Sequence, residues 1–480
     1  MRRAPVVLIR RAELTPGRLA DVRIAGDRVS EIGPGLAPLP GDDIVDAAGA
    51  ALLPGLHDHH LHLPALAAAL HSLRCGPPEV RTADELAARL VAADHAPDPD
   101  DAWLRGYGYH ESVAGDIGRD WLDAHVSRRP ARLQHRSGRL WVLNSRALGM
   151  LDDGAADSPL ERIAGRPTGR LYDGDDWLRR RLRGEWPDLA TASAFLARRG
   201  VTGITDATPG NDPDRLARLR DARDRGGIRQ RVLVMGDASL SAAASTDPRL
   251  RVGPLKIHLH ETALPGFDDL VAAMRASHAD GRAVAVHCVT RAELHFTLAA
   301  LREAGPGRGD RIEHASVAPP DTLPLLRALG LTVVTQPHFI LERGDAYLSD
   351  VDAEDRAWLY RLRSFLDAGI RLAAGSDAPF GDADPWRAMQ AAVDRRTASG
   401  AICGPDEALT PEQALALYCG DALDPGGAPR RIVAGAPADL CLLDRPWPAV
   451  RGNLGDARVR ITWSGGRVIW DAAAAGPAMS

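Results

Sequence analysis

Lysine is almost missing from this 480-residue chain. Lysine and arginine together number 59, and the sequence holds one lysine, Lys256, so 59 − 1 leaves 58 arginines. Most surface lysines can become arginine at little cost, because a solvated positive charge tolerates the exchange. Arginine has no free amine, so it cannot replace lysine where a nucleophilic or carboxylatable nitrogen is needed. Lys256 is therefore either a chance remnant or a residue whose amine has a function.

The chain also lacks a strong charge of one sign and any long apolar run. Its 64 acidic residues give a net charge of −5, with both signs interspersed, so no basic surface for nucleic acid is indicated. The apolar stretch 5–9 is stopped by Arg10, which makes it too short for an export signal or a membrane span. We therefore expect a cytoplasmic protein that binds neither nucleic acid nor a membrane.

Cysteines are few and scattered, and no two of them form a C-x-x-C pair. This argues against a disulfide framework and against a zinc site built from cysteine, as expected for a reduced compartment. The five are Cys75, Cys288, Cys403, Cys419 and Cys441.

The two ends of the chain share one pattern. Residues 5–55 alternate with the period of a β-strand, and Gly26-Asp27 between two apolar runs predicts a hairpin. The same pattern returns at 438–470. We expect one small β-sandwich domain assembled from both termini, comprising residues 1–55 and 428–480.

The middle of the chain, residues 56–427, repeats a strand followed by a helix. A strand, a helix and two loops take about thirty residues, and consecutive units at that spacing imply parallel strands. Eight such strands predict a (β/α)₈ TIM barrel. The expected strands are Leu52–Leu56, Val201–Asp206, Gln230–Met235, Leu255–His260, Ala283–His287, Arg311–His314, Leu331–Gln336 and Ile370–Asp377.

One interval is too long for this scheme. The first and second strands are separated by roughly a hundred residues more than one unit requires, which predicts an insertion at about 64–190. An insertion after the first strand leaves the barrel at its carboxyl end, where active sites lie. It is either a lid or pocket wall, or a structural elaboration with its own small core.

Metal-ligand residue types gather at the end of the first strand, in the sequence His57-Asp-His-His-Leu-His62. His60 and His62 are two residues apart, so on a strand their side chains point to the same side and can bind one divalent ion. His57 and His59 leave open which two histidines bind the ion. Asp58 could hydrogen-bond to one of the ligating histidines and orient it.

Further residues of ligand type fall where a barrel would bring them together. His287 ends the fifth strand, His314 the sixth and Asp377 the eighth, while Lys256 lies within the fourth. Residues at the carboxyl ends of different barrel strands converge on one mouth. We therefore expect one site that contains these four residues together with His60 and His62.

This pattern resembles the metal-dependent amidohydrolase superfamily, and more narrowly the branch of the YtcJ-like hydrolases and N-substituted formamide deformylase. The resemblance covers nearly the whole chain. The segments that carry it are Pro54-Gly55 with Asp58-His-His60-Leu-His62, Gly253-Pro-Leu-Lys256, Gln336-Pro337 with Gly344-Asp345 and Tyr347, Arg363-Ser364, Gly375-Ser-Asp377, Asp384-Pro385, Asn144-Ser145 with Ala147-Leu148, and Gly169.

The resemblance implies a hydrolase with two divalent metal ions, most often zinc, that cleaves a C–N bond of a small molecule. By that resemblance His60, His62 and Asp377 bind the first ion, and His287 and His314 bind the second. Lys256, carboxylated to a carbamate, would bridge both ions, and a bridging hydroxide would be the nucleophile. Asp377 would be the catalytic residue that moves the proton. Manganese, iron, cobalt or nickel would suit the same ligands.

The chain departs from the branch in two places beside the expected substrate pocket. After Lys256 the branch continues with Asp-Gly, but this chain reads Ile-His-Leu-His-Glu261; around 135–139 the branch has Asp-Gly-His, but this chain reads Arg136-Ser-Gly-Arg139. The resemblance therefore implies only the class of bond, which is an amide, an N-formyl group or a cyclic amide, and not the particular substrate. The histidines expected to line the pocket are His110, His258, His260 and His338.

Two other functions stay open. A deaminase of the same superfamily uses one metal ion and does not need the lysine on the fourth strand, and a non-catalytic barrel would serve in binding or assembly. The expected partner is a small-molecule substrate, and a homodimer is left open.

Overall fold

A computed structural model describes residues 6–97, 102–152, 158–182, 186–241 and 247–474. The chain divides into two compact units. One comprises Met1–Leu63 and Leu189–Ser480, and the other comprises Pro64–Asp188.

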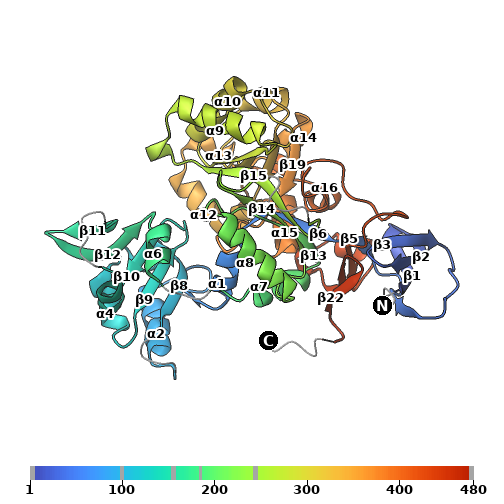
Figure 1. The fold of residues 1–480 in the computed structure, drawn as a ribbon, viewed down its shortest axis with the longest axis horizontal. Helices are drawn as coiled ribbons and strands as arrows, with labels where there is room; N and C mark the ends of the chain where they lie inside the picture. Colours follow the sequence, from blue (N-terminus) through green and yellow to red (C-terminus); the bar gives the residue numbers. More distant parts are fainter. Residues whose placement is uncertain (1–5, 98–101, 153–157, 183–185, 242–246, 475–480) are drawn as a thin grey trace. The chain divides into compact units, whose positions relative to one another are not determined.

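The larger unit contains an eight-stranded parallel sheet, which confirms the predicted barrel (Figure 1). Its buried strands are rich in apolar and β-branched residues, as expected for strands covered on both faces. In sheet order they are β6 (Leu56–Leu61), β13 (Val201–Asp206), β14 (Arg231–Gly236), β15 (Leu250–His258), β16 (Val284–Cys288), β17 (Arg311–His314), β18 (Thr332–Thr335) and β19 (Arg371–Ala374).

The barrel closes where the first and last strands meet, beside the expected site. The backbone N–H of Asp377 donates to the carbonyl of His60 at 2.6 Å, and that of His62 donates to the carbonyl of Ala378 at 2.9 Å. Gly375 permits this approach, because a Cβ at that position would lie 2.3 Å from the backbone nitrogen of His60. The closure therefore fixes β6 against the segment that carries Asp377.

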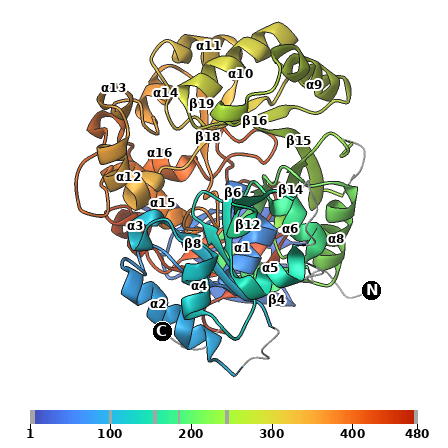
Figure 2. The ribbon, with the colours of Figure 1, turned by 90° about the vertical axis from the view of Figure 1, so that its left-hand side faces the viewer.

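Helices form the outer layer of the barrel, and α9, α10 and α11 lie together along one side of it (Figure 2). Helix α10 shows why these segments are helical. Thr290 and Glu293 form a capping box at its start, and Leu294, Leu298 and Leu301 make a buried stripe at helical spacing. The helices of this unit are α7 (Leu189–Ala197), α8 (Pro213–Asp224), α9 (Phe267–Ala279), α10 (Arg291–Ala304), α11 (Thr322–Ala328), α12 (Phe339–Asp350), α13 (Ala353–Arg356), α14 (Arg363–Asp367), α15 (Pro385–Asp394), α16 (Pro411–Ala416) and α17 (Trp447–Val450).

The prediction for the first barrel strand was wrong. The expected strand Leu52–Leu56 is split at Gly55: β5 (Leu52–Pro54) pairs with β20 (Leu440–Leu443) in a terminal sheet, and β6 begins at Leu56. Four of the six residues of β6 are histidine or aspartate, so hydrophobicity placed the strand on the apolar residues that precede them. As a consequence His60 lies within the barrel strand and His62 directly follows it.

Both ends of the chain contribute to two small four-stranded sheets, as predicted. Their facing side chains share one core, in which Val22 and Ile24 from the N-terminal region meet Leu440 and Trp463 from the C-terminal region. One sheet has the order β3 (Arg28–Gly33), β2 (Arg18–Ala25), β1 (Val6–Thr15) and β4 (Asp42–Asp46), and the other has the order β22 (Arg467–Asp471), β21 (Val459–Ser464), β20 (Leu440–Leu443) and β5.

The smaller unit is built on a six-stranded mixed sheet. Two apolar clusters pack within it, one including Leu104 and Leu133 and the other including Trp141 and Leu171. Its strands, in sheet order, are β11 (Leu160–Ile163), β12 (Arg166–Tyr172), β10 (Leu140–Leu143), β9 (Ala131–His135), β8 (Leu104–Tyr109) and β7 (Leu73–Arg74). Its helices are α2 (Ala83–Asp94), α3 (Glu111–Ala114), α4 (Arg119–His125), α5 (Ser145–Leu151) and α6 (Asp175–Arg181), while α1 (Leu63–Leu70) starts at the boundary between the units.

All five cysteines are buried and free. Among the described residues, no helix is both long enough and apolar enough to cross a membrane.

Candidate metal centre

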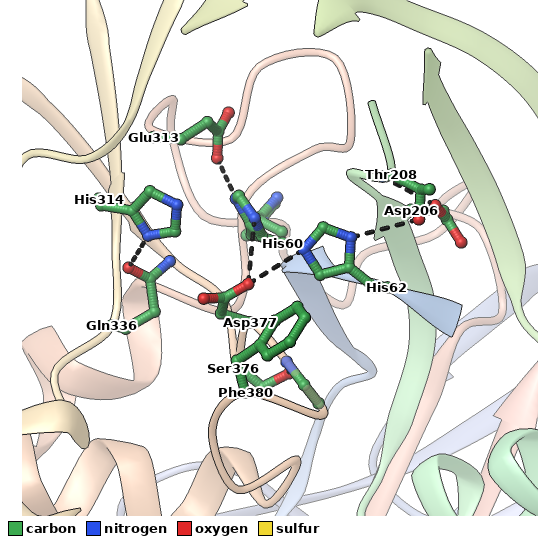
Figure 3. Close-up of polar contacts among 12 residues, drawn as sticks. His60, His62, Asp206, Thr208, Glu313, His314, Gln336, Ser376, Asp377 and Phe380 are labelled. Atoms are coloured by element: carbon green, nitrogen blue, oxygen red, sulfur yellow. Dashed lines mark hydrogen bonds and ion pairs between the residues drawn. The ribbon is translucent and has the colours of Figure 1, made fainter. Parts of the chain in front are cut away.

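Three residues from the two ends of the barrel sheet meet at its closure. Nε2 of His62 lies 3.2 Å from Oδ1 of Asp377, and Nε2 of His60 lies 3.4 Å from the same oxygen (Figure 3). The three potential ligand atoms all lie within 4.8 Å of one another. Two imidazoles and a carboxylate so arranged are a candidate site for a divalent ion.

Hydrogen bonds orient both rings so that Nε2 faces Asp377. Nδ1 of His60 contacts the carboxylate of Glu313, and Nδ1 of His62 lies 3.2 Å from Oγ1 of Thr208. A partner on one ring nitrogen selects which nitrogen is left for a metal. In both rings the nitrogen left is the one that points at the carboxylate.

Two more histidines continue the cluster across neighbouring strands. The ring of His314 lies 4.8 Å from that of His60 and 4.4 Å from that of His287, measured between ring centroids. Nδ1 of His314 lies 2.7 Å from Oε1 of Gln336, which again directs Nε2 away from its hydrogen-bond partner. His287 and His314 thus form a second pair of potential ligands beside the first group.

Lys256 is buried on β15 next to this cluster. Its Nζ has no hydrogen-bond partner within the described part of the chain. Burial lowers the pKa of the amine, and the nearby Arg311 adds to this, although the carboxylates of Glu313 and Asp377 oppose it. A buried amine without a partner is a costly feature that calls for a further group at that position.

The electrostatics of the site favour neutral rings beside an ionised carboxylate. Burial lowers the pKa of His60 to about 3, and the charge of Lys256 adds to the effect. Burial alone would raise the pKa of Asp377, but a hydrogen bond from His62 and electrostatic interactions with the His314 and His60 rings lower it below its ordinary value. Neutral imidazole and ionised carboxylate are the forms that bind metal ions.

Two of these residues have unusual backbone conformations. His314 has φ +70° and Asp377 has φ +53°, so both lie in the left-handed region at the end of a barrel strand. Such a conformation costs about 1–3 kcal/mol in a non-glycine residue and persists where the surrounding structure imposes it. Strain of this kind is found most often at functional sites.

A model of the Amidohydrolase family matches residues 43–470, which is most of the chain. The chain belongs to the Amidohydrolase family. This membership confirms the family expected from the sequence and the prediction that the protein is a hydrolase.

Individual relatives cover nearly the same extent. N-substituted formamide deformylase from Arthrobacter pascens is 28% identical over 515 aligned positions, which span 93% of this chain and 94% of the relative. The putative amidohydrolase YtcJ from Bacillus subtilis is 24% identical over 433 positions, spanning 79% of this chain and 80% of YtcJ. An uncharacterized metal-dependent hydrolase from Pyrococcus furiosus shares the fold, with a TM-score of 0.71 at 22% identity over 92% of this chain and 99% of that one.

Two residues that hydrogen-bond to this amidohydrolase site and position it were not predicted from the sequence. Arg311 and Glu313 are two residues apart on β17, so their side chains share a face, and both are buried. Arg311 binds Glu313 and donates from Nη2 to the carbonyl of His59 at 2.6 Å. The alternation on that strand was a usable signal, because two charged residues on one face of a barrel strand need partners.

Asp58 has a different position from the expected one. Its Oδ1 accepts the backbone N–H of His60 at 3.1 Å and that of Ser376 at 3.0 Å, so it contacts backbone rather than a ligand ring. Burial raises its pKa to about 6. Asp58 therefore ties β6 to the segment that precedes Asp377.

Of the four histidines expected to line the pocket, His258 contacts a proposed ligand and His260 contacts His258. The ring of His258 lies 4.2 Å from that of His287 and 4.5 Å from that of His260. β15 ends at His258, so His260 follows the strand and does not extend it. Their contact with substrate stays a prediction.

The other two lie in different surroundings. His338 is buried, and its Nε2 donates to the carbonyl of Ser376 at 3.0 Å. His110 belongs to the smaller unit, where it faces Glu111 and His135. A substrate-lining role for either residue stays a prediction.

Proposed function

We propose that the protein is a metal-dependent hydrolase that cleaves an amide, N-formyl or cyclic amide C–N bond of a small molecule. The observation that carries this proposal is the buried Nζ of Lys256, which has no hydrogen-bond partner among the described residues. It lies near the group His60, His62 and Asp377 and the neighbouring pair His287 and His314. Lysine carboxylation would supply what is missing there, because the carbamate is an anion with two oxygens that can bridge two ions.

In this proposal the ligands divide between two ions, and zinc suits all of them. His60, His62 and Asp377 would hold the first ion, and His287 and His314 would hold the second. The carboxylated Lys256 would offer an oxygen to each. The lowered pKa of Lys256 favours this modification, since only the neutral amine can attack the carbon of CO₂ and then release a proton.

The ions, when bound, would supply a hydroxide nucleophile at neutral pH and polarise the substrate carbonyl. Asp377 would act as general base and then as general acid. Its carboxylate, ionised because its pKa is low, would take the proton of the nucleophile and return it to the leaving nitrogen.

The substrate class rests on the relatives and on the reaction type. The formamide deformylase relative makes N-formyl amines the first compounds to test. A panel of N-formyl amines, N-acyl amines, hydantoins and lactams, assayed by product release with zinc-loaded enzyme, tests the proposal. Hydrolysis of at least one class would support it, and release of ammonia from an amino-substituted ring with none of these hydrolysed would favour a deaminase.

A further inference from the structure

The smaller unit has a second cluster of metal-ligating side chains. Strands β8 and β9 run parallel, with Tyr109 paired to His135, so their carboxyl ends lie at one edge of the sheet. His110 and Glu111 directly follow β8, and His135 ends β9. The topology thus brings two imidazoles and a carboxylate to the same edge.

The three side chains point at one another. Nε2 of His135 lies 2.9 Å from Oε2 of Glu111, and Nε2 of His110 lies 3.3 Å from Oε1 of the same carboxylate. The two rings stack with their centroids 5.6 Å apart. The three potential ligand atoms lie within 4.8 Å of one another, as do those of His60, His62 and Asp377.

A serine two residues after each histidine orients its ring. Oγ of Ser112 lies 2.8 Å from Nδ1 of His110, and Oγ of Ser137 lies 2.7 Å from Nδ1 of His135. With an ion on Nε2, the ring proton stays on Nδ1 and donates to the serine oxygen. Without an ion, Nδ1 accepts from the serine backbone N–H, at 3.2 Å in His110 and 3.1 Å in His135, and Nε2–H can donate to Glu111. Nδ1 of each ring therefore has a serine partner in both states, and in the ion-bound state the serine backbone N–H no longer donates to the ring.

A cavity of about 380 Å³ adjoins this cluster. Glu111 and His135 contribute to its wall, together with Tyr109 and Ser137. Three protein ligands leave an open coordination position on a tetrahedral ion, and the cavity has room for a water molecule there.

We propose that His110, Glu111 and His135 bind one divalent cation, for which zinc is the best match. Two imidazoles and one glutamate are an established ligand set for zinc, and softer or larger ions fit it less well. This site belongs to the smaller unit and is separate in composition from the ligands on the barrel strands. It adds a binding site to the protein whether or not the barrel holds two ions.

Zinc binding by the full-length protein tests this proposal. Chelator-treated wild type and the variants Glu111→Gln and His95→Asn are loaded with zinc, dialysed and analysed for metal per chain. His95 is an exposed histidine of the same unit, so His95→Asn is the matched control. We expect Glu111→Gln to retain one zinc ion per chain fewer than the wild type and the control. The Glu111 side chain is 61% exposed, so its substitution should leave the fold intact.

Two further variants keep the test decisive. Ser137→Ala removes the hydroxyl that accepts from Nδ1 of His135 and from the backbone N–H of Arg139, and leaves the three proposed ligands in place. It should weaken zinc binding at this site by about 10–100-fold in a chelator competition. In a His60→Asn/His62→Asn background, Glu111→Gln should still lower the zinc content by one ion per chain. This result would show that the lost ion is not bound by the barrel ligands. Equal zinc content in wild type and Glu111→Gln, with no change in affinity for Ser137→Ala, would overturn the proposal.

Discussion

Glu313 binds Nδ1 of His60, and both side chains are buried, with 0% and 1% exposed. Its other carboxylate oxygen accepts a hydrogen bond from Nε of Arg311. A carboxylate held by a buried guanidinium stays ionised and can hold the imidazole proton on Nδ1. Nε2 of His60 is thereby kept as the nitrogen that faces Asp377.

Glu313→Gln should therefore weaken metal binding without removing a ligand. A neutral amide can offer its oxygen to only one of the two donors, and its NH₂ group would then face either His60 or Arg311. We expect the zinc affinity of the barrel site to fall by about 10–100-fold, as is typical when the partner of a ligating histidine is lost. Chelator competition with zinc measures this.

Glu407→Gln is the matched control for that substitution. Glu407 is also buried and also pairs with an arginine, with its Oε1 3.3 Å from Nη1 of Arg361, but it has no contact with the proposed ligands. It should lower the melting temperature and leave zinc affinity unchanged. Equal affinities in the two variants and the wild type would refute the orienting role of Glu313.

Lys256→Arg should abolish most of the hydrolytic activity while keeping the positive charge. Arginine cannot form the carbamate, so the second ion would lose its bridge. Loss of one Lewis acid removes several kcal/mol of transition-state stabilisation, and we expect kcat/KM to fall at least about 100-fold. Metal analysis of the same sample should show fewer ions per chain. Retained activity with unchanged metal content would instead favour the mononuclear deaminase.

Gly375→Ala should disturb both stability and metal binding. The added Cβ would lie 2.3 Å from the backbone nitrogen and 2.6 Å from the Cβ of His60, so the barrel closure must shift. Overpacking of this kind costs about 1–3 kcal/mol. Gly452→Ala is the control, since nothing lies within 4 Å of a Cβ there. Thermal unfolding and zinc titration of both variants check the prediction, and equal behaviour would contradict it.

The metal-free protein should lose stability as the pH falls below neutrality. Burial lowers the pKa values of His57, His59, His60 and His287 below the unfolded value of 6.5, so between pH 7.5 and 6 only the unfolded chain gains these protons. Proton uptake by the unfolded state lowers the free energy of unfolding, by about 3 kcal/mol for four such groups over this interval. Above pH 7.5 this contribution to stability is fully present.

Thermal unfolding of chelator-treated protein measures this effect. For a chain of this length we expect the melting temperature to fall by about 3 °C between pH 7.5 and pH 6. The raised pKa of Asp58, about 6, acts in the opposite direction by about 0.4 kcal/mol over this interval, because the folded carboxyl is half protonated at pH 6. A melting temperature that is constant or rises over the interval would contradict the prediction.

The barrel could be predicted from the sequence because its strands are spaced regularly. Val201–Asp206 and Arg311–His314 coincide with β13 and β17, since each is a short buried run bounded by turn residues. The split between β5 and β6 was not predicted, because four of the six residues of β6 are polar and the division depends on which strand each segment pairs with. Pairing partners are set by tertiary contacts that a single sequence does not contain.

The proposed ligands could be found from the sequence because histidine and aspartate are rare at strand ends. The residues that hydrogen-bond to the ligand rings were not found. His60, His62 and Asp377 are conspicuous residue types at barrel positions, and the structure brings them together. Glu313 and Gln336 are ordinary residues whose importance lies in the ring nitrogen that each one contacts. Such contacts depend on side-chain orientation across neighbouring strands, which sequence spacing alone does not fix.

A crystal structure of the protein loaded with zinc and bicarbonate, with anomalous data at the zinc edge, would show whether the barrel holds two ions and a carboxylated Lys256. We expect two anomalous peaks among His60, His62, His287, His314 and Asp377, with electron density that extends beyond Nζ of Lys256 to bridge them. A single peak in the barrel beside an unmodified Lys256 side chain would contradict this expectation.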